Sequence, residues 1–292
     1  MFENLVGNNE IKNELENIIK TGKIANSYMF SGIEGIGKKG FAREFAKHIL
    51  CLKDINCNNT CDSCKKFDAK SNPDYVEIDY GEYKKDIITI DQIREKVVNN
   101  ANEKPIISNK KVYVIDNADR MNESAQNALL KTLEEPPKFV VIILIVSNDN
   151  LLLPTIKSRC VRIKFSSLSN DEIEKAIGKK TDDELEILNG SLKDYEQLND
   201  KLEKYRQIID LINNLKTKDL LYVLNNSDIL YKNKDEIMNL LNYMNVCLLN
   251  NGMLDLISVV EKTKQKVKIN NNYEMTIDNL LIKSWKKING KE

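Results

Sequence analysis

The stretch at residues 27–50 reads SYMFSGIEGIGKKGFAREFAKHIL and decides the fold class of this chain. Its first five residues predict a short buried strand, the glycines from Gly32 to Gly37 end that strand, and the pattern that follows predicts a helix to about Leu50. Between a strand and a helix, the spacing G-x-x-x-x-G-K is that of a phosphate-binding loop, in which backbone N–H groups and the lysine hold phosphates. A glycine turn with no role in nucleotide binding is the alternative interpretation.

Outward from this loop, short apolar runs alternate with helical patterns as far as about residue 165. Further strands are predicted at residues 74–79, 111–115, 139–146 and 161–163, and further helices behind Thr89 and at residues 122–134. Apolar strands that alternate with helices are typical of a parallel sheet covered on both faces. The first part of the chain is therefore predicted to be an α/β domain of the P-loop NTPase type.

The strand signal fades after Phe165. Short helical patterns interrupted at Gly178 and Gly190 come next, and from Leu202 the pattern is helical nearly to the end. These changes predict three parts, and the sequence places their boundaries as follows: an α/β domain at 1–166, a small helical domain at 167–200 and an all-helical domain at 201–292.

The candidate nucleotide site lacks two side chains that hydrolysis needs. A Ser or Thr hydroxyl should follow Lys38 and ligate Mg²⁺, but Lys39 stands there, and its ammonium would repel the cation unless it turned into solvent. The apolar strand at residues 111–115 ends in Asp116, which would help to hold Mg²⁺, but the next residue is Asn117, whose amide cannot accept a proton from water. We expect nucleotide binding without useful hydrolysis, or a vestigial site. The candidate residues of this site are Gly32, Gly35, Gly37, Lys38, Lys39 and Asp116.

Four cysteines lie within fourteen residues of a polar segment, at Cys51, Cys57, Cys61 and Cys64. Four thiolates so close together can form a tetrahedral zinc site that is closed to water and therefore structural. A redox-active dithiol made of Cys61 and Cys64 is the rival interpretation. The zinc site would form an insertion at about residues 51–64 of the α/β domain.

Composition bounds the remaining possibilities. The 292 residues are 41% hydrophobic and 30% charged, with 11 Gly and 5 Pro, which is typical of a folded, helix-rich protein of about two domains. Charge is balanced, 44 Lys and Arg against 44 Asp and Glu, so no overall field favours nucleic acid or an anionic membrane. The N-terminus lacks a signal-peptide pattern, and no apolar run approaches the ~20 residues of a membrane span. We expect a cytoplasmic protein with reduced or metal-bound cysteines.

Two further motifs are more specific than helical periodicity. They are DRMNESAQNALLKTLEEPP at residues 119–137 and Ser158-Arg159-Cys160. Together with the phosphate loop, they resemble the clamp-loader subunits of bacterial DNA polymerase III, which belong to the AAA+ class and carry an N-A-L-L-K-x-L-E-E-P-P helix and an S-R-C motif. The motifs fall within residues 1–200, and the rest of the chain resembles the family only in helical character and length.

Within this family the ATPase subunits have intact phosphate loops, whereas the delta-prime branch has degraded loops and keeps the S-R-C motif. Lys39 and Asn117 therefore place the sequence with the delta-prime branch. The resemblance implies an AAA+ domain with a zinc module, a helical lid and a helical collar that oligomerises. It implies no ATPase activity of its own, but membership of the DNA polymerase III holoenzyme, a DNA-directed DNA polymerase.

The resemblance also implies a role for Arg159. In the family, the arginine of this motif acts in trans as an arginine finger on the γ-phosphate of ATP in a neighbouring ATPase subunit. A planar, permanently charged guanidinium suits this task. The alternative is a structural salt bridge near a strand end.

The implied partners are the gamma/tau ATPase subunits and the delta subunit, with the sliding clamp and primed DNA reached through the assembled complex. Two other functions stay open at this point. One is an active clamp-loader ATPase subunit of the gamma/tau type, and the other is a zinc-bearing DNA-binding module.

Overall fold

The computed structural model describes residues 1–53, 57, 59–79, 87–193, 195, 198–269 and 272–290. The chain forms two compact units, Met1–Lys179 with Gly190–Lys193 and Lys180–Asn189 with Asp194–Glu292.

The first unit is built on a five-stranded parallel sheet with the order β2-β3-β4-β1-β5. Its strands are β1 (Ser27–Ser31), β2 (Tyr75–Ile78), β3 (Lys111–Ile115), β4 (Val140–Val146) and β5 (Val161–Lys164). Every residue of β1, β3 and β4 is buried, as expected for strands with helices on both faces. The predicted α/β fold with a parallel sheet is therefore confirmed.

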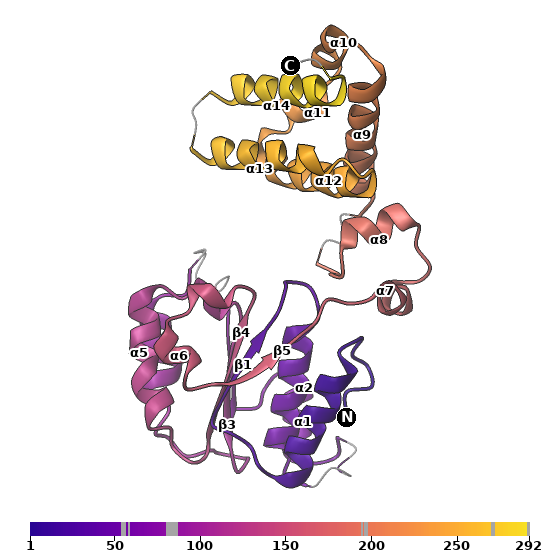
Figure 1. Cartoon of the computed structure of the whole chain (residues 1–292). Coiled ribbons are helices and arrows are strands. Elements are labelled where there is room, and N and C mark those ends of the chain that lie inside the picture. Colours follow the sequence, from indigo (N-terminus) through magenta and orange to yellow (C-terminus); the bar gives the residue numbers. More distant parts are fainter. Residues whose placement is uncertain are drawn as a thin grey trace. The chain divides into compact units, whose positions relative to one another are not determined.

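Helices cover both faces of this sheet (Figure 1). On one face lie α1 (Asn9–Thr21) and α2 (Lys38–Leu50), the helix that follows the glycine loop. On the other, α5 (Glu123–Glu134) packs Ala125, Leu129 and Leu133 against side chains of β3 and β4. This packing leaves the carboxyl ends of the strands free for polar residues, where ligand sites of open α/β sheets lie.

Short elements connect the layers of the first unit. They are α3 (Asp62–Asp68), α4 (Ile90–Ile93), the π-helical turn Arg94–Val98, the 3₁₀ turns Ala118–Arg120 and Asp149–Leu151, α6 (Pro154–Lys157) and α7 (Asn170–Ile177). The predicted cap Thr89 is present, because its side chain and that of Gln92 form a capping box at the start of α4.

The secondary-structure elements described in the second unit are all helices. It contains α8 (Asp182–Leu188), α9 (Leu198–Thr217), α10 (Leu220–Asn225), α11 (Asp228–Lys232), the 3₁₀ turn Lys234–Glu236, α12 (Ile237–Asn250), α13 (Leu254–Ile269) and α14 (Tyr273–Ile288). The predicted domain boundaries at 167 and 201 remain predictions. The two compact units divide the chain differently, because α7 lies in the first unit and α8 in the second. Among the described residues, no helix is both long enough and apolar enough to cross a bilayer.

Candidate functional site

The glycine loop lies between β1 and α2, as predicted, and a second segment closes over it. Gly35 has a left-handed φ of 81°, and a Cβ there would lie 2.1 Å from Ser191 Oγ, so only glycine fits. Ser191 Oγ donates a hydrogen bond to the carbonyl of Glu34 (2.7 Å), and the Leu192 N–H donates to the carbonyl of Gly35 (3.0 Å). These contacts border a cavity of about 320 Å³ that is also lined by Lys38, Lys39 and Asp116.

Lys38 points into its own loop. Its Nζ donates to the carbonyls of Gly32 and Ile33, both at 2.6 Å, and lies 3.4 Å from Ser147 Oγ at the tip of β4. The side chain is buried, and burial lowers its pKa against the opposing effect of nearby carboxylates such as Asp119. Lys38 therefore satisfies the loop carbonyls in the position from which a P-loop lysine would reach a phosphate.

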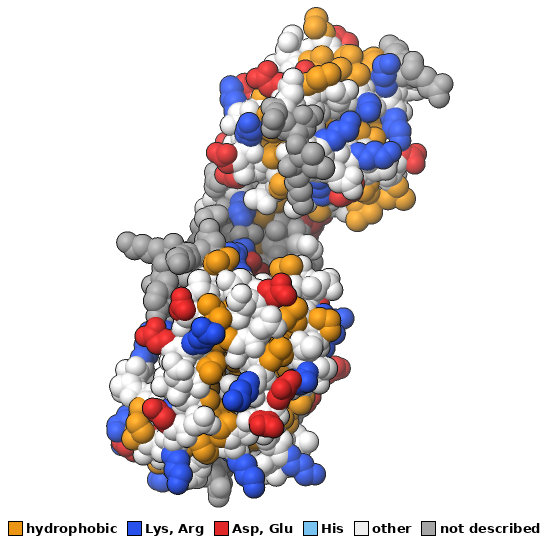
Figure 2. Space-filling view, turned by 90° about the vertical axis from the view of Figure 1, so that its left-hand side faces the viewer, with side chains coloured by type: hydrophobic (Ala, Val, Ile, Leu, Met, Phe, Trp, Pro, Cys, Tyr) orange, Lys and Arg blue, Asp and Glu red, His pale blue; other side chains and the backbone are white. Residues whose placement is uncertain are grey.

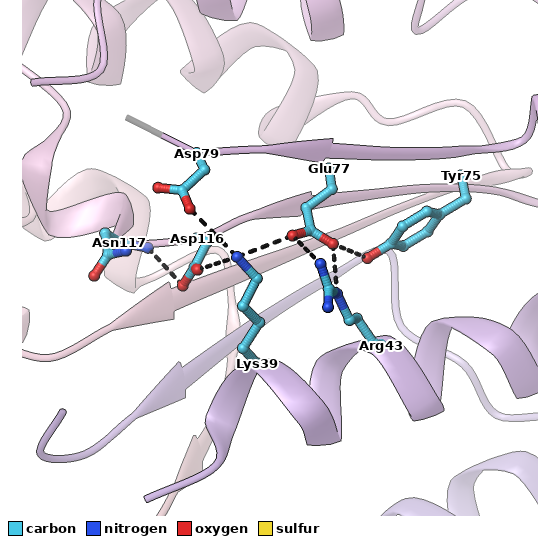
Figure 3. A network of polar contacts seen from close by, with 7 residues as sticks. All are labelled: Lys39, Arg43, Tyr75, Glu77, Asp79, Asp116 and Asn117. Atoms are coloured by element: carbon cyan, nitrogen blue, oxygen red, sulfur yellow. Dashed lines mark hydrogen bonds and ion pairs between the residues drawn. The ribbon is translucent and has the colours of Figure 1, made fainter. Parts of the chain in front are cut away.

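Lys39 binds the carboxylates at the sheet edge (Figure 3). Its Nζ lies 2.8 Å from Asp116 Oδ2, 3.0 Å from Glu77 Oε1 and 3.3 Å from Asp79 Oδ2. Burial lowers the pKa of Lys39, but the ion pairs with Asp116 and Glu77 outweigh it and raise that pKa overall. The side chain thus does not turn into solvent, the option that sequence alone left open, because three carboxylates at the carboxyl ends of β2 and β3 hold it.

A second pair of contacts fixes the same carboxylates. Arg43, one turn along α2 from Lys39, forms two hydrogen bonds of 2.7 Å with the carboxylate of Glu77, and the hydroxyl of Tyr75 donates to the same group (2.7 Å). Burial raises the pKa of Glu77, but Arg43, Tyr75 and Lys39 together lower it to about 2. The network therefore joins the first turns of α2 to the ends of β2 and β3.

Asn117 follows Asp116 with a left-handed φ of 50°, and its N–H donates to Asp116 Oδ1 at 3.0 Å. The predicted residues of the nucleotide site are thus brought together by the fold. Sequence reasoning missed Arg43, Glu77 and Asp79, although acidic residues at the end of the predicted strand 74–79 were a usable signal.

Arg159 lies between α6 and β5. The buried Ser27 hydroxyl at the start of β1 donates to the carbonyl of Arg159 (2.6 Å) and so fixes its backbone. The guanidinium pairs with Glu134 at the end of α5 (Nη2 to Oε1, 2.9 Å) and donates to the carbonyl of Thr155 (2.8 Å). Its side chain remains 34% exposed. Arg162, on β5, is instead paired with Asp149.

The four predicted cysteine ligands lie together. The Sγ atoms of Cys51, Cys57, Cys61 and Cys64 are all within 4.8 Å of one another, and those of Cys51 and Cys61 are 3.8 Å apart. A tetrahedron with Zn–S bonds of about 2.3 Å has edges of about 3.8 Å, so the donor set fits this ion.

Backbone groups support this cluster. The N–H of Cys61 donates to Cys57 Sγ and the N–H of Cys64 donates to Cys61 Sγ, both at 3.4 Å, and the second of these bonds caps the N-terminus of α3. The first of these bonds is the main reason that the pKa of Cys57 falls to about 6, whereas burial raises that of Cys51 to about 11. Such N–H···S bonds orient thiolate ligands, so the four cysteines could hold a structural metal ion such as zinc.

Comparison with known proteins identifies the family of this chain. The family described as "DNA polymerase III, delta subunit" matches residues 7–169, more than half of the chain. The DNA polymerase III subunit tau of Bacillus subtilis is 36% identical over 195 residues, which cover 65% of this chain and 34% of that protein. The DNA polymerase III subunit gamma/tau of Mycoplasma genitalium is 38% identical over 174 residues, or 59% of this chain and 28% of that protein.

A crystal structure of a DNA polymerase III gamma subunit-related protein from Thermotoga maritima is 20% identical, with a TM-score of 0.47, and the match covers 94% of this chain and 99% of that chain. The chain spans about a quarter to a half of the length of the curated relatives it matches. The family match over residues 7–169 contains the glycine loop, the cysteine cluster and Arg159. This chain belongs to the DNA polymerase III clamp-loader family.

Proposed function

We propose that this chain is a delta-prime type subunit of the clamp loader, a stator that does not hydrolyse ATP and that donates Arg159 to a neighbouring ATPase subunit. The observation that carries this proposal is the contact of Lys39 with Asp116 at 2.8 Å. Lys39 thereby pairs with the carboxylate that would otherwise help to hold Mg²⁺, and Asn117 supplies no base. A chain with these features is expected to assist hydrolysis elsewhere in an assembly.

The partners follow from this assignment. They would be gamma/tau ATPase subunits and a delta subunit, with the sliding clamp and primed DNA reached through the assembled loader in the cytoplasm. Residues 1–166 would form the AAA+ domain, residues 167–200 the lid and residues 201–292 the collar through which subunits associate. The cysteine cluster would hold a structural Zn²⁺ on the AAA+ domain.

An active ATPase subunit is the alternative, and the matched relatives carry gamma and tau names. The isolated chain decides between the two. We expect no Mg²⁺-dependent ATP hydrolysis above that of a Lys38→Ala variant, because the site has neither a free metal ligand at Asp116 nor a base at residue 117. Phosphate release that Lys38→Ala abolishes would instead identify this chain as a motor subunit.

DNA contact is a second candidate function, favoured by a groove in the helical unit. A cavity of about 1280 Å³ between α13 and α14 is lined by five lysines and by no acidic residue among its described lining side chains. These lysines are Lys262, Lys266, Lys283, Lys286 and Lys287. Figure 2 shows basic side chains gathered on this unit. Clustered cations of this kind neutralise phosphates, so a chain of balanced net charge can still carry a local polyanion site.

Fluorescence anisotropy with a labelled DNA duplex tests this candidate. The double variant Lys283→Glu/Lys286→Glu should weaken binding and reduce the slope of log affinity against log salt by about 2, since each phosphate contact contributes about 0.9. Lys216→Glu/Lys232→Glu, on α9 and α11, is the matched control and should bind as the wild type does. Equal DNA binding by the two double variants would show that the groove does not bind DNA.

A further inference from the structure

The three carboxylates at the sheet edge converge on a single cation. Glu77 comes from β2, Asp79 follows β2, and Asp116 follows β3, so these groups meet only because β2 and β3 are neighbours in the sheet. An ammonium group has three N–H donors and no acceptor. Lys39 Nζ lies within 3.3 Å of one oxygen from each carboxylate, and its donors and these acceptors therefore match in number.

The position of this ammonium has a chemical meaning in a phosphate loop. The residue after the loop lysine normally supplies a hydroxyl to Mg²⁺, and the carboxylate at the end of a neighbouring strand supports the same ion. Here Lys39 occupies the first position and contacts Asp116 in the second. The positive charge thus lies at the place that the fold reserves for a divalent cation.

The surrounding charges explain why a cation is needed there. Arg43 is engaged with Glu77 through two hydrogen bonds, so Lys39 is the basic group that contacts both Asp79 and Asp116 in the described structure. Asp79 Oδ1 is buried and has no hydrogen-bond partner among the described residues. Without the ammonium, carboxylates would face one another across a partly buried space, and carboxylate oxygens are the ligands that Mg²⁺ and Mn²⁺ prefer.

We propose that Lys39 is a built-in replacement for the divalent cation: it neutralises Glu77, Asp79 and Asp116, keeps Mg²⁺ out, and covers a latent divalent-cation site that its removal would open. This inference deepens the proposed function and rests on it only in taking residues 32–39 to be a degenerate phosphate loop. The site would take Mg²⁺ or Mn²⁺ through the three carboxylates, and a serine at residue 39 would add a hydroxyl ligand.

Manganese binding by the isolated chain tests this proposal, with free Mn²⁺ measured by electron paramagnetic resonance. We expect the wild type to bind no Mn²⁺ at this edge and Lys39→Ser to gain one site. Addition of Mn²⁺ should also raise the unfolding temperature of Lys39→Ser, because a ligand that binds only the folded state stabilises it. Lys39→Arg keeps the charge and should gain no site.

Two further variants test whether the gained Mn²⁺ site lies at the three carboxylates. Lys47→Ser removes another lysine of α2, paired with Asp68 away from the loop, and should leave Mn²⁺ binding as in the wild type. Lys39→Ser/Asp116→Asn should lose the new site. If Lys39→Ser does not fold, Lys39→Met is measured in the same way, since it also uncovers the carboxylates.

Binding of Mn²⁺ by the wild type that Asp116→Asn abolishes would overturn the proposal, because Lys39 would then not exclude the ion. A folded Lys39→Ser or Lys39→Met that binds no Mn²⁺ would also overturn it. These measurements use neither ATP nor a partner subunit, so their failure is distinct from a failure of Arg159 to act in trans.

Discussion

Replacement of Arg159 by alanine is expected to slow ATP hydrolysis at the neighbouring site of a reconstituted clamp loader by about 10³–10⁵-fold, the usual contribution of an arginine finger. The guanidinium is one-third exposed and is held by Glu134 and by the Thr155 carbonyl. A surface ion pair of this kind contributes about 0–1 kcal/mol, so a partner's γ-phosphate can compete for the arginine. The measurement is the clamp- and DNA-stimulated ATPase rate, with assembly checked by size exclusion.

The matched control is Arg162→Ala. Arg162 lies three residues away on β5, is paired with Asp149 and is more exposed than Arg159, so its loss should leave the ATPase rate nearly unchanged. Arg159→Lys should not restore the rate, because an ammonium lacks the planar fork of the guanidinium. An intact loader with Arg159→Ala and a normal rate would leave this chain with a purely structural role.

Loss of one cysteine ligand is expected to have the other large effect. Wild-type chain should contain about one zinc ion, and Cys64→Ser should contain almost none and unfold at a markedly lower temperature. The reason is that structural zinc contributes folding free energy, about 10–16 kcal/mol of apparent binding energy in isolated zinc-finger peptides. Here Cys61 caps α3 and Cys64 lies in its first turn, so this helix depends directly on the cluster. Metal content and thermal unfolding measure the two effects.

Cys160→Ser is the control for this experiment. Cys160 is a half-buried thiol outside the cluster, and burial raises its pKa to about 11. The control should keep its zinc. If wild-type chain instead holds no metal and forms a reversible Cys61–Cys64 disulfide under mild oxidation, the rival redox interpretation would replace the zinc site.

Local sequence patterns located most of the first unit. The predicted strands at 74–79 and 139–146 correspond to β2 at Tyr75–Ile78 and β4 at Val140–Val146. These predictions succeed because each depends on one continuous apolar run and the residues that end it. The cysteine cluster was predictable for the same reason, since its four ligands lie close together in the sequence.

The charge network around Lys39 could not be predicted in this way. Lys39 and Asp116 are far apart in the chain, and their contact depends on where β1, which leads into α2, and β3 lie in the sheet, which no local pattern encodes. The pairing of Arg159 with Glu134 likewise depends on how α5 and α6 pack. Local propensity also gave no sign of the π-helical turn at Arg94–Val98.

A cryo-electron microscopy structure of the assembled loader with an ATP transition-state analogue would show whether Arg159 acts in trans. We expect the guanidinium of Arg159 to leave Glu134 and to lie within hydrogen-bonding distance, about 2.7–2.9 Å, of an oxygen of the γ-phosphate mimic in the adjacent subunit. We also expect Lys39 to keep its contact with Asp116 in this chain. An Arg159 that stays on Glu134, or Mg²⁺–nucleotide bound at Lys38 of this chain, would contradict the proposed stator function.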